Sequence, residues 1–235
     1  MTSTRSDIMI IGASVAGMSV AACLHKLGVR YTIIEKESAV AMPWRLHYDR
    51  LHLHTPRNTS HLPHLRFPGT AEKYPSRVQV VDYLESYQRA FGIEPLFNVA
   101  ATRIFRKDDS WQVETPGQSF SCRFLVVATG TYHHPRPFSA SGLETFPGTV
   151  MHSSCYRCGR SFKGKRVVVV GFGNSACEIA MDLSEHGARP ALSVRSPVNV
   201  IPRDILGIPI LSISAIMQRF PPQIADKINR PLLRL

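Results

Sequence analysis

A short apolar strand that runs into a glycine-rich loop and then into a helix occurs twice in this chain. Asp7–Ile11 is followed at once by a loop that starts and ends with glycine, and Val167–Val170 leads into a second glycine-rich loop. Short continuous apolar runs are typical of strands buried on both faces of a parallel sheet. The tight turn and the helix N-terminus after each strand suit the pyrophosphate of a dinucleotide. We therefore predict an α/β protein with two Rossmann-like dinucleotide-binding units.

The remaining segments divide between two domains, residues 1–150 and a partial second domain, residues 151–235. The residues after Gly171 are fewer than the roughly 100 that a nucleotide-binding domain normally uses, so we expect a second domain truncated at the C-terminus. Residues 39–76 carry many prolines and histidines and are expected to form a long covering loop, and short helices are expected after Ile205. The regular elements expected from spacing and turn residues are a helix to about Leu27, strand Tyr31–Ile34, helix Val78–Phe91, a small β-meander of Thr102–Phe105, Trp111–Thr115 and Phe120–Val127, a helix to about His186 and strand Ala191–Val194.

The first loop is predicted to bind FAD. Gly12 and Gly17 occupy the first and third positions of the dinucleotide fingerprint, although Ser14 replaces the middle glycine. Glu35 ends the next strand, where a carboxylate can accept both ribose hydroxyls and would repel a 2′-phosphate. This unit should therefore hold FAD or NAD rather than NADP. The residues assigned to this site are Gly12, Ala13, Ser14, Val15, Ala16, Gly17, Glu35 and Lys36, with Ala128 and Gly130 after the strand Phe120–Val127.

The second loop is predicted to bind NADPH. Its following strand ends on Arg195 and Ser196 instead of an acid, and a guanidinium presents a planar fork of donors to phosphate oxygens. The alternative is that Arg195 is an ordinary solvated strand end. The residues assigned to this site are Gly171, Gly173, Asn174, Ser175, Ala176, Arg195 and Ser196.

Composition limits the other classes of function. The formal net charge is +11, but the basic residues are scattered and form no run, so we expect no nucleic-acid partner and attribute the charge to phosphate-bearing cofactors. We find no apolar run of about 18 residues and no signal segment, so no integral membrane segment is expected. Five cysteines do not make the framework of a small secreted domain. We expect a cytoplasmic protein.

The sequence resembles the class B flavin-dependent monooxygenases, and most closely the YUCCA-type enzymes and their bacterial relatives. The segment Phe146–Tyr156 fits the family signature F-x-G-x-x-x-H-x-x-x-Y/F immediately before the second loop. The resemblance extends from about Asp7 to about Leu206. Further similar segments are Tyr48–Pro56, Tyr83–Tyr87, Gly173–Ser175 and Val194–Pro197.

This resemblance implies that NADPH reduces FAD and that O2 adds to the reduced flavin to give a C4a-(hydro)peroxyflavin, which oxygenates a small organic substrate. An indole-3-pyruvate-like 2-oxo acid is the candidate substrate that the YUCCA type implies. The resemblance also places Trp44 and Arg45 beside the flavin, His54 at the catalytic position near C4a, and the main chain near Ala101 at the adenine. The alternative for His54 is an ordinary packing histidine.

Two other interpretations stay open. Cys155 and Cys158 form a C-x-x-C before the second loop, as in FAD- and NADPH-dependent disulfide reductases of the thioredoxin-reductase type. The chain could also be a truncated, non-catalytic nucleotide-binding remnant. A metal site is not expected, because the histidines of residues 52–64 lie in an irregular segment without acids or cysteines. The oligomeric state is left open.

Overall fold

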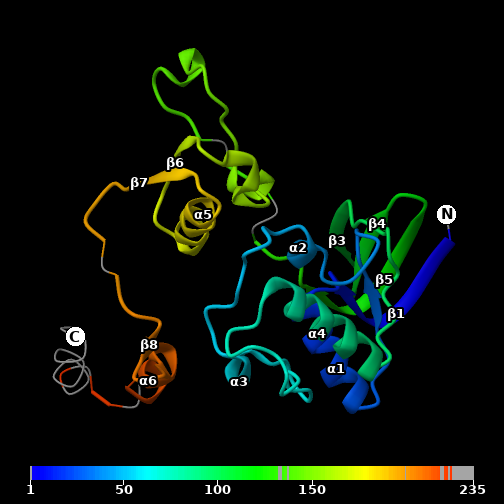
Figure 1. The fold of residues 1–235 in the computed structure, drawn as a ribbon. Coiled ribbons are helices and arrows are strands. Elements are labelled where there is room, and N and C mark those ends of the chain that lie inside the picture. Colours follow the sequence, from blue (N-terminus) through cyan, green and yellow to red (C-terminus); the bar gives the residue numbers. More distant parts are fainter. Residues whose placement is uncertain are drawn as a thin grey trace.

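The larger sheet contains both strands expected beside the first glycine loop. The computed structural model describes residues 2–131, 134–136, 138–198, 200–217, 220–221 and 223, and within them the strand order is β2-β1-β5-β4-β3 (Figure 1). β1 (Thr2–Ile11) runs parallel to β2 (Thr32–Ile34) on one side and to β5 (Gln118–Val127) on the other. β4 (Ser110–Thr115) and β3 (Arg103–Lys107) add an antiparallel hairpin to β5. The predicted meander is confirmed.

The side chains of β1 alternate between two apolar clusters, as expected for a strand buried on both faces. Ile10 packs with α1 (Val15–Lys26) and α4 (Arg77–Ala90), which lie together over one face of the sheet (Figure 1). Met9 and Ile11 face the other side, in a cluster with Val113 and Phe120 of the meander. These clusters fix the end of β1 from both sides, so the loop that follows starts from a rigid position.

The predicted start of β1 at Asp7 was too late. Residues Thr2–Ser6 also form part of the strand, because they pair in parallel with Gln118–Cys122. This polar stretch carries no apolar pattern, so only its long-range partner makes it a strand.

The long segment between β2 and α4 is irregular, apart from two single-turn helices, α2 (Met42–Arg45) and α3 (Arg57–Ser60). An isolated bridge joins His52 to Ser76. Ser76 then caps α4: its hydroxyl accepts from the backbone N–H of Gln79, and the Gln79 side chain accepts from the backbone N–H of Ser76. The covering loop predicted here therefore ends at a well-defined helix start.

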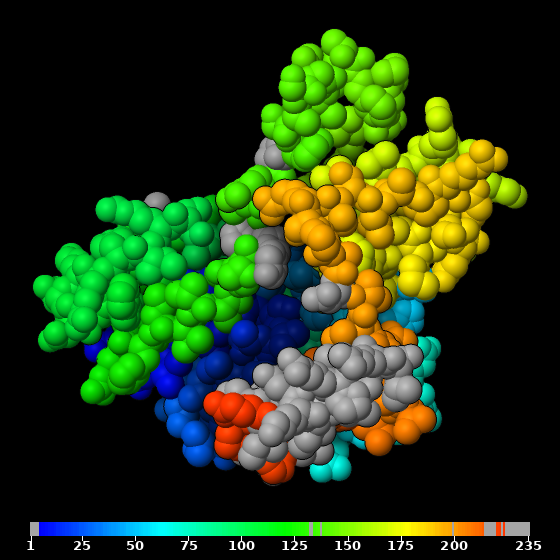
Figure 2. Space-filling model, turned by 90° about the vertical axis from the view of Figure 1, so that its left-hand side faces the viewer, coloured from blue at the N-terminus to red at the C-terminus, as the bar shows by residue number. Residues whose placement is uncertain are grey.

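The second unit is smaller. Its strands β6 (Arg166–Val170) and β7 (Arg189–Ser193) pair in parallel, and α5 (Asn174–Glu185) connects them. They are the only strands of this sheet among the described residues. A connector with the short 3-10 helices η1 (Leu143–Thr145), η2 (Ser153–Cys155) and η3 (Gly159–Phe162) leads into the unit, and its first part stands out as a separate lobe (Figure 2).

The tail after the second unit returns to the first. β8 (Asp204–Ile205) and β9 (Ile208–Pro209) form a hairpin that the sequence did not predict, and α6 (Ile210–Met217) agrees with the short helices expected there. The Asp204 carboxylate accepts from the Tyr74 hydroxyl (2.8 Å) and from Lys73. The remainder of the predicted helical tail lies mostly outside the described residues. In the described part, none of the helices is both long and apolar enough to cross a membrane.

Candidate functional site

The first glycine loop makes a turn that only glycine fits. Gly12 has a φ of +103°, and a Cβ there would lie 2.5 Å from the carbonyl oxygen of Ala128. Hydrogen bonds hold both backbones in place: Gly12 N–H donates to Ile34 O, and Ala128 N–H donates to Ile11 O, each at 2.8 Å. The carboxyl ends of β1, β2 and β5 therefore meet at this loop.

Helix α1 starts close behind the loop. A Cβ on Gly17 would lie only 1.8 Å from Gly12 O, so this second glycine permits the helix to approach the strand end. Ser14 is the N-cap residue, but its side chain makes no capping hydrogen bond to any described group. The first turn has no acidic residue. The N-terminus of α1 thus keeps its positive end of the helix dipole. The other loop residues assigned from sequence are Ala13, Val15 and Ala16, of which Ala13 is buried and Ala16 exposed.

Glu35 is held against this loop. Its carboxylate accepts the backbone N–H of Ala13 at 2.7 Å and that of Glu37 at 3.0 Å. Two backbone groups thus fix the carboxylate at the end of β2, while an ionised carboxylate offers about four acceptor positions, so capacity for a diol remains. Lys36, also assigned from sequence, points into solvent and pairs with Glu37 (3.6 Å).

Trp44 and Arg45 belong to α2, which lies near this loop. Trp44 is half-buried against the core cluster formed by α1 and α4, and Arg45 pairs with Glu85 of α4. Ala41, in front of α2, has a φ of +62°, an uncommon backbone conformation for a residue other than glycine. Such conformations persist only where the surroundings enforce them.

His54 is half-buried, and its Nε2 is a buried atom without a hydrogen-bond partner among the described residues. Buried polar atoms are nearly always paired, so an orphaned ring nitrogen indicates that a partner is missing. This orphaned nitrogen makes His54 a candidate contact for a bound group with a polar edge.

The other residues assigned to the first site lie on the strand ends. Ala101 is half-buried and packs against the cluster around Val113, and Ala128 contributes the backbone bond to Ile11 described above. Gly130 is exposed, with a φ of +77°.

The second glycine loop has the same turn with more space around it. Gly171 has a φ of +115° and donates its N–H to Ser193 O at 2.9 Å. No described atom lies within 4 Å of a Cβ placed on Gly171 or Gly173. Gly173 is the N-cap of α5, whose first residues Asn174 and Ser175 are exposed.

Arg195 and Ser196 follow the end of β7 and are both exposed. Strand β7 ends at Ser193, so they lie just beyond it. The structure brings them to the same carboxyl edge as Gly171, because β6 and β7 are parallel and Val170 pairs with Ser193. Ala176, the small third residue of this loop, is half-buried in α5.

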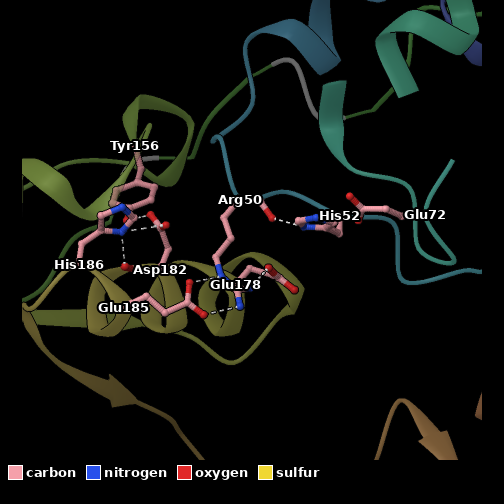
Figure 3. A network of polar contacts seen from close by, with 8 residues as sticks. All are labelled: Arg50, His52, Glu72, Tyr156, Glu178, Asp182, Glu185 and His186. Carbon is pink, nitrogen blue, oxygen red and sulfur yellow. Dashed lines mark hydrogen bonds and ion pairs between the residues drawn. The ribbon is translucent and has the colours of Figure 1, made fainter. Parts of the chain in front are cut away.

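A polar network between the two units was not predicted from the sequence. Arg50 lies in the irregular segment and contacts Glu178 and Glu185 of α5 (Figure 3). Glu178 and Glu185 are two helical turns apart and so lie on one face of α5, a spacing that the sequence does contain. Their partner could not be read from that spacing.

The geometry of both glycine loops is compatible with a bound dinucleotide. The first has a glycine cradle that a Cβ would fill, an open helix N-terminus and a fixed carboxylate, and it lies in the same unit as a buried nitrogen that lacks a partner. No comparable arrangement exists for a metal ion among the described residues, which contain no group of three or more His, Cys, Asp or Glu side chains that could hold one.

Comparison with known proteins identifies the family. The family model described as pyridine nucleotide-disulphide oxidoreductase matches residues 9–204, from β1 into β8. The chain belongs to this family. Within it, this member is homologous to YUCCA-type flavin monooxygenases at about 40% identity.

Three relatives illustrate the similarity. The probable indole-3-pyruvate monooxygenase YUCCA9 of Arabidopsis thaliana is 40% identical over 222 residues, which cover 91% of this chain and 53% of that protein. A flavin-containing monooxygenase from Stenotrophomonas maltophilia is 28% identical with a TM-score of 0.75, over 80% of this chain and 57% of that one. The structure of OTEMO in complex with FAD and NADP is 25% identical with a TM-score of 0.68, over 86% of this chain and 41% of that one. The chain spans about half the length of the curated relatives it matches.

The family name includes disulphide chemistry, and this member has the C-x-x-C pair noted from its sequence. Cys155 is exposed at the end of η2, and Cys158 is half-buried as the N-cap of η3. Both are free thiols in the described structure. Between them Tyr156 is buried against α5, so the pair belongs to the second unit.

Proposed function

We propose that this chain is the nucleotide-binding part of a flavin monooxygenase, with FAD on the Gly12 loop and NADPH on the Gly171 loop. In this proposal residues 1–150 form the FAD-binding domain and residues 151–235 contribute to the NADPH-binding domain. The observation that carries the proposal is the carboxylate of Glu35, bound to the backbone N–H of Ala13 beside the Gly12 cradle. The similar proteins, which include flavin monooxygenases and a complex with FAD and NADP, support the same assignment.

The roles of the chain's own residues follow from their positions. The backbone around Gly12 and the N-terminus of α1 bind the FAD pyrophosphate, and Glu35 accepts the ribose hydroxyls. The exposed guanidinium of Arg195 and the hydroxyl of Ser196 take the 2′-phosphate of NADPH, which the Glu35 site would repel. When bound, FAD supplies the hydride-accepting and oxygen-reacting chemistry, and the protein positions it.

His54 is assigned the role of a hydrogen-bond partner to the flavin. Its Nε2 is buried, so in the Nε2–H tautomer it can hold a proton at that atom away from water. Trp44 and Arg45 of α2 are assigned to the segment that covers this site. Trp44 packs on the core cluster and Arg45 pairs with Glu85, and these contacts hold α2 in place. The substrate class supported by the name of YUCCA9 is an indole-bearing 2-oxo acid, with O2 as the second substrate.

The test uses the purified chain reconstituted with FAD. We expect about one FAD per chain, bleaching of the flavin by NADPH without oxygen, and oxygen uptake with indole-3-pyruvate that exceeds uptake with an alkyl sulfide. The His54→Ala variant should still bind FAD and be reduced, but should give less product per NADPH. A chain that binds neither nucleotide would refute the proposal. A chain that binds both nucleotides but shows no NADPH-dependent oxygen uptake would support a non-catalytic nucleotide-binding remnant. NADPH oxidation that requires a disulfide substrate would instead support the reductase interpretation.

A further inference from the structure

The side chain of Arg50 bridges two carboxylates of α5. Its Nε and one terminal nitrogen donate to the two oxygens of Glu185 at 2.9 and 2.8 Å, and the other terminal nitrogen donates to Glu178 at 2.5 Å (Figure 3). The Glu178 side chain is only 11% exposed and that of Arg50 is 22% exposed. The hydrogen bond to Glu185 raises the pKa of Arg50, and the same contact lowers the pKa of Glu185. This is an oriented contact that uses the whole guanidinium fork.

Neighbouring residues dock the same segment on the second unit. Tyr48 is buried with Tyr156 and with Ile179 and Leu183 of α5. The backbone N–H of Asp49 donates to Arg157 O at 2.9 Å. The segment therefore contacts α5 from Glu178 to Glu185 in the last turn.

The opposite end of the segment is fixed to the first unit. The backbone N–H of Arg77, at the start of α4, donates to Leu51 O at 2.7 Å, and that of Leu53 donates to Pro75 O at 2.8 Å. His54 follows directly. The segment 46–54 therefore contacts both units, with His54 directly after the backbone bonds to the first unit and Arg50 among the contacts with the second.

Helix α5 connects Arg50 to the second loop. Gly173 caps its N-terminus, Ser175 lies in its first turn, and Glu178 and Glu185 lie farther along the same rigid element. The charge-assisted contacts of Arg50 with two carboxylates thus form a continuous physical connection from the N-terminus of α5 to the segment 46–54.

We propose that Arg50 is a positioning residue that couples the second nucleotide site to His54. A dinucleotide on the Gly171 loop would shift α5 as a unit, and Arg50 would pass this shift to the segment 46–54 and hence to the Nε2 of His54 at the flavin. The inference rests on the proposed function, because it requires nucleotides at both loops. Lysine could replace only part of this contact, since it carries a single charge without the fork.

The test is amide hydrogen exchange of the FAD-loaded chain with and without NADP⁺, which needs no turnover. In the wild type, NADP⁺ should slow exchange in both 171–176 and 46–54, the latter by about fivefold or more, the usual lower range of coupling between sites. In Arg50→Gln, NADP⁺ should still protect 171–176 but leave 46–54 nearly unchanged. Arg50→Lys should restore a part of the response.

Two further variants separate coupling from general loosening. Arg77→Gln removes an ion pair to Asp49 (3.1 Å) within the first unit, and it should retain the NADP⁺ response in 46–54. Glu185→Gln removes the carboxylate that accepts two hydrogen bonds from Arg50. The Glu185 side chain is 52% exposed, so this variant should fold normally and show a weaker NADP⁺ response in 46–54. Unchanged protection of β1 and β5 amides reports that each variant is folded.

The outcomes are distinct. Arg50→Gln and Glu185→Gln proteins in which NADP⁺ still protects 46–54 as in the wild type would overturn the coupling role and leave the proposed function intact. A wild type in which NADP⁺ does not protect 171–176 would refute the NADPH site itself, and the coupling role with it.

Discussion

Substitutions at two glycines with positive φ separate backbone strain from steric overlap at the first loop. Gly12 and Gly28 have φ values of +103° and +68°. An alanine at either position carries a strain of about 1–2 kcal/mol. At Gly28 the added Cβ meets no described atom within 4 Å, whereas at Gly12 it lies 2.5 Å from Ala128 O. Ordinary contact begins at 3.4 Å, so that carbonyl must move, at a further cost of about 1–3 kcal/mol typical of overpacking.

The assay is thermal unfolding with and without FAD. Gly28→Ala should lower the melting temperature by roughly 2–8 °C, since one kcal/mol shifts a chain of this size by about 2–4 °C. FAD at 100 times its dissociation constant adds about 2.7 kcal/mol, so wild type and Gly28→Ala should both gain roughly 5–11 °C on adding FAD. Gly12→Ala should gain clearly less, because the displaced carbonyl of Ala128 borders the loop on which we propose that the pyrophosphate binds. Gly12→Val should gain nothing.

The result that would refute this reasoning is a Gly12→Val protein with the flavin content and FAD-induced stabilisation of the wild type. A loss of FAD binding in Gly28→Ala as well would show that general destabilisation is responsible, and the assignment of FAD to this loop would lose its support.

Three further predictions concern the second unit. Arg195→Ala should weaken NADP⁺ binding by roughly 10- to 150-fold, because a charge-assisted hydrogen bond is lost, and should change NAD⁺ binding little. Titration with both coenzymes measures the two affinities, and an equal loss for both would indicate a folding defect. Cys155→Ser and Cys158→Ser should leave NADPH-dependent flavin reduction at the wild-type rate in stopped-flow measurements, and a lost disulfide-reductase activity would contradict the monooxygenase proposal. Arg50 lowers the pKa of Glu185 below its ordinary value of 4.5. The ion pair should therefore contribute fully to stability above pH 4.5, and this contribution should be lost as the pH falls through the lowered pKa of the folded state. Urea unfolding should therefore show a difference between wild type and Arg50→Gln at pH 6–7 that shrinks below pH 4.5, and a difference independent of pH would argue against the ion pair.

Local patterns predicted the elements around both loops well. Continuous apolar runs and glycine turns gave β1, β6 and their helices, and the acid after β2 lies at the Gly12 loop as its position indicated. These features depend on residues close in the sequence, where period and turn chemistry act directly. The role of each assigned site residue remains a prediction.

Features that depend on distant partners were missed. The polar residues 2–6 become a strand only through β5, and the β8–β9 hairpin docks through contacts of Asp204 with Lys73 and Tyr74. The contacts of Arg50 likewise join segments far apart in the chain. No local period encodes such pairs, because ion pairs depend on the tertiary arrangement and not on spacing.

The pairing of β1 has a consequence for how the chain folds during synthesis. The short strand β2 can pair only with the last residues of β1, and Thr2–Ser6 find their partner only when β5 has been made. Strand pairs that close such long loops form slowly, and exposed edges promote aggregation in the meantime. During synthesis, the N-terminal half of β1 therefore stays unpaired until α1, α4 and the meander have been made. Co-translational protection of the N-terminal half of β1 should be acquired late, together with β5, although β1 precedes β5 in the chain by more than 100 residues.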